Sequence, residues 1–134
     1  MTETSNPWGN QATPYQEVGG EAGVRALVEA FYDVIEAESP DLRSLLPANT
    51  TNTRRKFFMY LTGWLGGPPL YEQQYGHPRL RMRHLPFAIG QRQTDEWIRC
   101  MRLAMAEAEM GEPLRSFLEA KFEPLAQHMR NQPD

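Results

Sequence analysis

Apolar residues recur along two long stretches of the chain at the spacing of one face of an α-helix. In residues 21–38 they stand three and four positions apart with charged residues between them: Val24, Leu27, Val28, Phe31, Val34 and Ile35. Residues 51–65 repeat the pattern with larger side chains: Phe57, Phe58, Leu61, Trp64 and Leu65. Because an α-helix turns once every 3.6 residues, both stretches predict amphipathic helices that bury one face.

Two more amphipathic helices are predicted in the second half of the chain. The first covers residues 91–111, and its apolar positions are Trp97, Ile98, Met101, Leu103, Met105 and Ala108. The second covers residues 112–129 and has Pro113 near its start, where the missing N–H does no harm. Its apolar positions are Leu114, Phe117, Leu118, Phe122, Leu125 and Met129. No stretch alternates as a half-buried strand does, so we expect an all-α fold of four principal helices.

The segments outside these helices differ in character. Residues 1–14 are polar and contain Asn, Pro and Gly, which predicts a flexible N-terminal tail ahead of one domain over residues 15–134. The glycines and prolines of residues 66–69 end the second long helix, and residues 70–90 show no sustained periodicity. An irregular stretch of this length inside a compact domain is more often functional than connective.

Composition and charge narrow the class of protein. A chain of 134 residues with 40% hydrophobic residues is long enough for one domain with a substantial core. The net charge of −3 disfavours a nucleic acid as the main partner. The sequence contains neither a basic-then-apolar leader nor a run of 18 apolar residues, so we expect no secretory signal and no membrane span. The single cysteine, Cys100, fits a reducing cytoplasm.

Few residues outside the irregular stretch suggest chemistry. The three histidines, His77, His84 and His128, lack the spacing of a structural zinc site. Cys100 lies beside Ile98 on a predicted helix, which favours a buried, inert thiol over a redox or nucleophilic one. The chain also lacks a glycine-rich phosphate loop and a nucleophile elbow.

The irregular stretch contains the unusual segment Gly76-His-Pro-Arg-Leu-Arg-Met-Arg-His-Leu-Pro-Phe87. Three arginines at alternate positions, Arg79, Arg81 and Arg83, stand between two histidines. The pattern alone favours a basic surface loop. The alternative is a haem site, because haem iron is commonly held by one neutral imidazole and arginines pair with the haem propionates.

A resemblance to a known family changes the balance between these alternatives. The chain resembles the group II truncated haemoglobins over residues 15–131. The similarity rests on Phe31-Tyr32, Leu65-Gly-Gly-Pro-Pro-Leu-Tyr71, the segment of residues 76–87 and Trp97-Ile-Arg-Cys-Met101. It implies a truncated globin fold, a two-over-two helical sandwich around haem b, and reversible binding of dioxygen, NO and CO.

The resemblance also implies roles for individual residues. His84 matches the proximal iron ligand, and Arg83 matches the arginine that pairs with a propionate. Tyr32 and Trp97 match the distal donors that stabilise the bound gas. Further pocket positions are Leu46, Thr53, Phe57 and Tyr71, with Leu61, Met82 and Phe87 as pocket wall or core and His77 as a surface residue or a contact at the haem edge. Leu46 replaces the usual aromatic or histidine, and Phe57 stands where relatives carry Gln or Leu, so we expect a tight, apolar distal pocket.

Two functions remain open at this stage. Two donors in an apolar pocket, each worth about 1–3 kcal/mol, would slow the release of dioxygen about 100-fold or more. Slow release favours redox chemistry, as an NO dioxygenase or a peroxidase supplied by a separate reductase. The alternative is a storage, transport or sensing protein without turnover, and a haem-free helical sensor is the least favoured. We expect a cytoplasmic monomer or homodimer that binds neither nucleic acid nor membrane.

Overall fold

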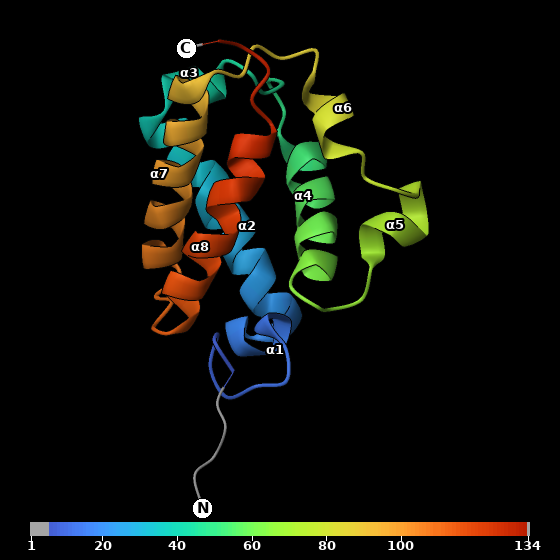
Figure 1. Ribbon diagram of the computed structural model, residues 1–134, viewed down its shortest axis with the longest axis vertical. Coiled ribbons are helices and arrows are strands. Elements are labelled where there is room, and N and C mark those ends of the chain that lie inside the picture. The colour runs from blue at the N-terminus through green and yellow to red at the C-terminus, as the bar shows by residue number, and fades with distance from the viewer. Residues whose placement is uncertain (1–5, 134) are drawn as a thin grey trace, which may run out of the picture.

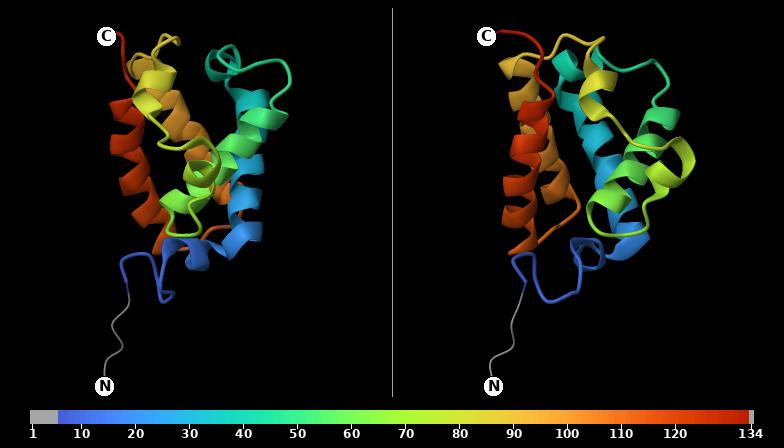
Figure 2. Two further views of the ribbon diagram at one scale, coloured as in Figure 1. Left: turned by 90° about the vertical axis from the view of Figure 1, so that its right-hand side faces the viewer. Right: turned by 45° about the vertical axis from the view of Figure 1, so that its right-hand side comes forward.

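In the computed structural model, which describes residues 6–133, four long helices form two layers (Figure 1). They are α2 (Gly20–Glu38), α4 (Thr51–Trp64), α7 (Gln91–Glu107) and α8 (Leu114–His128). α2 packs against both α7 and α4, and α7 packs against α8 (Figure 2). The α2–α4 pair thus lies over the α7–α8 pair, which confirms the predicted all-α, two-over-two arrangement of helices.

The core lies between α2, α4, α7 and α8. The predicted apolar stripes supply it, and its largest fully buried side chains include Leu27, Phe31, Met101, Leu118 and Phe122. Cys100 is also fully buried there, and burial raises the pKa of its thiol. The prediction of a buried cysteine is therefore confirmed, and its raised pKa fits an inert thiol because the reactive form is the thiolate.

Local sequence fixes the start of the long α2 helix. The short helix α1 (Pro14–Val18) begins where the Thr13 hydroxyl accepts a hydrogen bond from the Gln16 amide at 3.1 Å. It ends at Gly19, whose φ of 108° is a left-handed conformation that favours glycine. The chain turns there, and α2 starts at the next residue.

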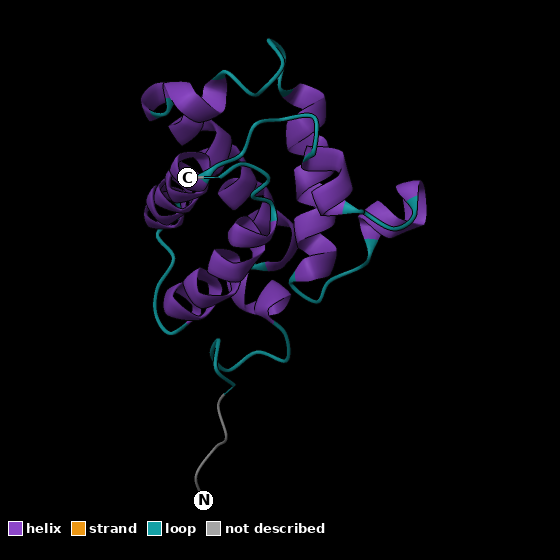
Figure 3. Ribbon diagram, turned by 45° about the horizontal axis from the view of Figure 1, so that its top comes forward, coloured by secondary structure: helices purple, strands orange, loops and turns teal. Residues whose placement is uncertain are grey.

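Residues 70–90 contain more helix than their sequence predicts. The expectation of an irregular stretch is wrong for α5 (Leu70–Tyr75), which packs against α4 (Figure 1), and for α6 (Leu80–His84). Neither short helix completes two turns, so neither can establish the periodicity from which an amphipathic helix is predicted. Another short helix, α3 (Pro40–Arg43), follows α2. In the described part of the chain loops connect all of these helices, and none of it forms a strand (Figure 3).

Part of the segment expected to be a flexible tail packs against the helices. The Trp8 ring meets Phe117 of α8 edge-on, with 5.3 Å between ring centroids, and its indole N–H donates to the Gln11 carbonyl at 2.9 Å. The Gln11 amide in turn donates to the Glu17 carboxylate at 3.0 Å. Residues 1–5 of the expected tail lie outside the described residues. No helix in residues 6–133 is long and apolar enough to cross a membrane.

Candidate functional site

A cluster of aromatic rings joins three of the four long helices. Phe31 and Tyr32 come from α2, Phe57 from α4 and Trp97 from α7. The Tyr32 ring lies 6.0 Å from that of Phe57, which lies 6.4 Å from Trp97, and Phe31 lies 5.2 Å from both Tyr32 and Trp97. The structure therefore brings together Tyr32, Phe57 and Trp97, three of the residues expected in a distal pocket.

Two hydrogen-bond donors of this cluster are available for a ligand. Within residues 6–133, neither the Tyr32 hydroxyl nor the Trp97 indole N–H makes a hydrogen bond. Tyr32 is only 6% exposed, and its burial raises the pKa of the phenol. The hydroxyl consequently stays protonated over the physiological pH range and can act as a donor.

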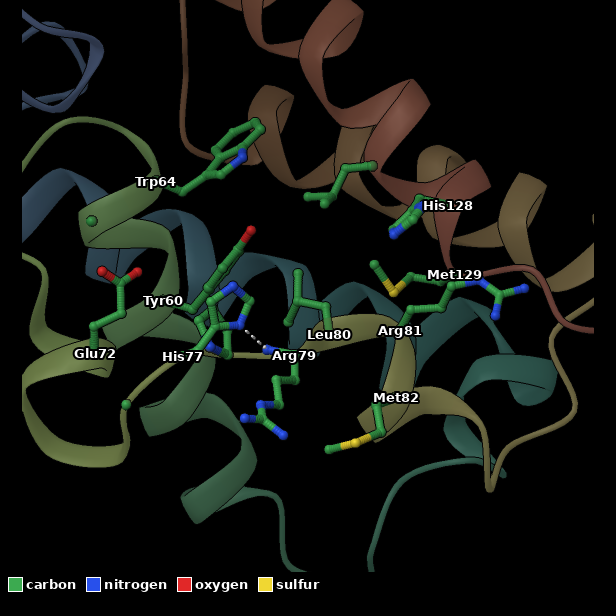
Figure 4. A pocket seen from close by; sticks show the side chains of 14 residues that line it. Tyr60, Trp64, Glu72, His77, Arg79, Leu80, Arg81, Met82, His128 and Met129 are labelled. Carbon is green, nitrogen blue, oxygen red and sulfur yellow. Dashed lines mark hydrogen bonds between the residues drawn. The ribbon is translucent and has the colours of Figure 1, made fainter.

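A cavity of about 720 Å³ opens between α4, the segment before and within α6, and α8 (Figure 4). Its size is within the range of ligand and cofactor pockets. Apolar and aromatic side chains form much of the lining: Tyr60, Trp64, Leu80, Met82, Leu125 and Met129. Polar side chains that also face it include His77, Glu72, Arg79, Arg81 and His128. An apolar cavity with a few basic groups suits a flat apolar ligand that carries negative charge.

The distal cluster and the cavity are joined through a chain of rings. Trp97 lies 5.5 Å from Phe122 of α8, and Phe122 stacks on Trp64 with 4.9 Å between centroids. Trp64 itself lines the cavity. Ring-to-ring contacts thus run without interruption from Tyr32 to the cavity.

His84 ends α6 with its ring in a defined orientation. The ring Nδ1 lies 2.6 Å from the Leu80 carbonyl oxygen, one helical turn earlier. A carbonyl can only accept, so Nδ1 carries the proton and Nε2 keeps the lone pair that binds a metal. Leu80 lines the cavity, which places His84 on the helix face next to it. A hydrogen bond of this kind to the far ring nitrogen is the usual support of a metal-ligating histidine.

The surface around His84 is unusually apolar. Among the described residues, the large hydrophobic side chains that are exposed are Met82, Leu85 and Phe87, at 52%, 52% and 40%. The Phe87 ring lies 6.5 Å from the His84 ring. Contiguous exposed apolar side chains mark a binding surface. An apolar patch beside a free imidazole nitrogen fits the face of a haem.

The remaining expected residues take different places. Met82 and His77 line the cavity, and the His77 Nδ1 accepts from the Arg79 amide at 3.0 Å. Arg83 is exposed, and its Nε donates to the Pro78 carbonyl at 2.8 Å.

Of the expected site residues, all of them within residues 6–133, only Met82 and His77 line this cavity. The cavity lining does not include the following expected residues: His84, Arg83, Phe87, Tyr32, Phe57 and Trp97. Four more lie elsewhere in the fold. Leu61 is fully buried and belongs to the core cluster. Tyr71 packs between Tyr60 and Tyr75. Leu46 packs against the core from the loop before α4, and Thr53 lies on α4, one turn before Phe57.

Sequence analysis missed several cavity residues, among them Tyr60, Leu125, His128 and Met129. Leu125 and Met129 were assigned to the buried face of the last helix, and a stripe of apolar residues has the same appearance whether it faces the core or a cavity. Within residues 6–133 no group of three or more His, Cys, Asp or Glu side chains could hold a metal ion.

The family model described as bacterial-like globin matches residues 13–131. The chain is 43% identical over 119 residues to the group 2 truncated haemoglobin YjbI of Bacillus subtilis (strain 168), covering 89% of each chain.

Solved structures show the same relationship. The group II truncated haemoglobin of Bacillus anthracis is 40% identical with a TM-score of 0.89, over 92% of this chain and 100% of that one. The group II 2-on-2 haemoglobin of Agrobacterium tumefaciens is 41% identical with a TM-score of 0.87, over 92% and 97%. A truncated oxygen-avid haemoglobin of Bacillus subtilis is 42% identical with a TM-score of 0.84, over 89% and 99%.

Proposed function

Because the chain belongs to the bacterial-like globin family, among the group II truncated haemoglobins, we propose that His84 holds the iron of its haem b. The hydrogen bond from Nδ1 to the Leu80 carbonyl at 2.6 Å leaves Nε2 free as the ligand atom. Met82, Leu85 and Phe87 offer apolar side chains to the macrocycle. The observation that carries this assignment is the apolar, exposed surface around an imidazole whose Nδ1 faces the Leu80 carbonyl.

Arg83 is the proposed partner of a haem propionate. Its Nε is occupied by the Pro78 carbonyl, and no ion pair with a carboxylate of residues 6–133 engages its terminal amino groups. Those groups are free to bind a carboxylate through charge-assisted hydrogen bonds. His77, in the cavity lining two residues before Arg79, is the proposed contact at the haem edge.

Tight retention of dioxygen is the proposed property of the distal pocket. When bound, haem supplies reversible dioxygen binding and the one-electron chemistry that links dioxygen to nitric oxide. Tyr32 and Trp97 would each donate one hydrogen bond to the bound gas, and in an aromatic pocket each bond would be worth about 1.4 kcal/mol, or tenfold in release rate. Phe31 and Phe57 keep water from competing for those donors. The relative from Bacillus subtilis described as oxygen-avid supports this assignment.

A protein that releases dioxygen slowly is better suited to consuming it than to delivering it. We therefore propose that the chain converts nitric oxide and dioxygen to nitrate, with a separate reductase returning the electron. The sequence has no flavin or nicotinamide motif of its own, which is the reason for a separate partner. Carbon monoxide would compete for the same pocket.

Two measurements test these proposals in order. Purified protein should show a Soret band that His84→Ala greatly weakens, and an unchanged band in that variant would reject His84 as the ligand. The dioxygen-loaded protein should then be mixed with nitric oxide and a cellular reductase fraction with NADH. Sustained nitrate formation supports the enzyme, whereas one equivalent of nitrate and a permanently ferric protein would indicate a storage or sensing protein.

A further inference from the structure

The segment that carries His84 has little support of its own. α6 is only five residues long, and in the described part of the chain it is not among the helices that pack extensively against one another. Met82 of α6 is exposed, and so are Leu85 and Phe87, which follow the helix. After His84 the chain continues without a helix until Gln91. The position of the histidine must therefore be fixed by contacts from elsewhere.

Those contacts come from the residues that follow α8. The side-chain amide of Asn131 donates to the Phe87 carbonyl at 2.8 Å and to the His84 carbonyl at 3.2 Å. Its Oδ1 accepts from the Ile89 amide at 2.9 Å. The Asn131 and Gln132 backbone amides both donate to the Ile89 carbonyl, at 2.8 and 3.1 Å. One asparagine thus engages three residues of the turn that follows α6.

The pattern of donors and acceptors requires an amide at this position. Two carbonyl oxygens face the amino group of Asn131, and one amide N–H faces its oxygen. A carboxylate in the same place would put a negatively charged oxygen against the two carbonyl oxygens, and these groups repel each other. The carbonyl of His84 also accepts from the Phe87 amide at 3.0 Å. Asn131 therefore adds a second donor at the end of the helix that carries the proposed iron ligand.

We propose that Asn131 is a positioning residue for His84, holding the turn after α6 so that the imidazole meets the haem in one orientation. This inference rests on the proposed role of His84. Arg81 strengthens the same connection, because its guanidinium donates to the Arg130 carbonyl at 3.1 Å. The residues after α8 therefore restrain α6 and the turn that follows it, on the proximal side of the site.

The test compares Asn131→Asp with Asn10→Asp, which makes the same change of charge at an exposed asparagine of the N-terminal segment. We measure the Fe–His stretching band of the ferrous protein by resonance Raman spectroscopy, and the rate of haem transfer to an excess of a high-affinity apoglobin. Asn131→Asp should shift or broaden the band and speed haem loss about tenfold, the effect of losing one to two hydrogen bonds. Asn10→Asp should match the wild-type protein in both measurements.

Asn131→Ala provides a second variant, because it removes the amide without adding a charge. Deuterium exchange of the Ile89 amide in the haem-free protein shows whether its hydrogen bond to residue 131 has been lost. An unchanged Fe–His band and haem loss within twofold of wild type in both Asn131 variants would overturn the proposal, even if their thermal midpoints fell. The role of His84 itself has a separate control: the wild-type protein should show an Fe–His band, and His84→Ala should abolish it. If either expectation fails, the proposed role of His84 is rejected.

Discussion

Tyr32→Phe is the most informative substitution in the distal pocket. It removes one hydroxyl from a side chain that is 6% exposed, and it leaves in place the ring that packs against Phe31 and Phe57. Within residues 6–133 that hydroxyl has no hydrogen-bond partner, so its removal leaves no protein group unsatisfied. The substitution therefore separates what the hydroxyl contributes to folding from what it contributes to the bound gas.

The two contributions differ in size. Loss of one hydrogen bond to dioxygen in an apolar pocket corresponds to about 1.4 kcal/mol, so dissociation should be about tenfold faster. The stability of the haem-free protein should stay within about 0.5 kcal/mol of wild type, because the hydroxyl has no protein partner in residues 6–133 to lose. A tyrosine whose hydroxyl is bound to protein would instead lose about 1 kcal/mol on the same substitution.

Dissociation is measured by stopped-flow replacement of dioxygen with carbon monoxide, and stability by urea unfolding of the haem-free protein. Tyr15→Phe is the matched control, because it removes a hydroxyl from a half-buried tyrosine of α1, outside the aromatic cluster. Trp97→Phe should also speed dissociation about tenfold. If the two donors act independently, their fold-changes in dissociation rate multiply in the double variant. If dissociation changes by less than about twofold in both single variants, the two-donor mechanism is refuted.

Three further predictions concern stability. Gly23→Ala should destabilise the protein by about 1–3 kcal/mol in urea unfolding, because its Cβ would overlap the Val18 carbonyl oxygen at the corner between α1 and α2. Arg54→Met should cost about 1–2 kcal/mol, less in high salt, because the half-buried guanidinium holds three carboxylates of α2 at 2.9, 3.0 and 3.4 Å. Hydrogen bonding from Arg99 lowers the pKa of Glu96 below its ordinary value of 4.5. The Glu96 carboxylate therefore stabilises the folded protein above that pH, and this contribution is lost as the pH falls. Glu96→Gln should therefore flatten the acid side of the stability–pH profile measured by urea unfolding, and an unchanged profile would contradict this assignment.

The four long helices were predictable because each is long enough to show its period. The expected range of residues 21–38 differs from the observed α2 (Gly20–Glu38) by a single residue. α5 and α6 escaped detection because five or six residues cannot display a repeat of 3.6. The contacts of Trp8 with Phe117 were unpredictable for another reason, since a tryptophan in a polar segment gives no indication of the helix it will meet.

Within the site, the sequence determined chemistry and the tertiary structure determined geometry. The resemblance identified His84, Tyr32 and Trp97, whose residue types and motif are local properties of the chain. Only the fold shows that α2, α4 and α7 bring the distal rings within 6.4 Å of their neighbours and leave two donors without protein partners in residues 6–133. It also places Asn131 against His84, 47 positions earlier. Contacts between residues so distant in sequence depend on how helices pack, which no local pattern encodes.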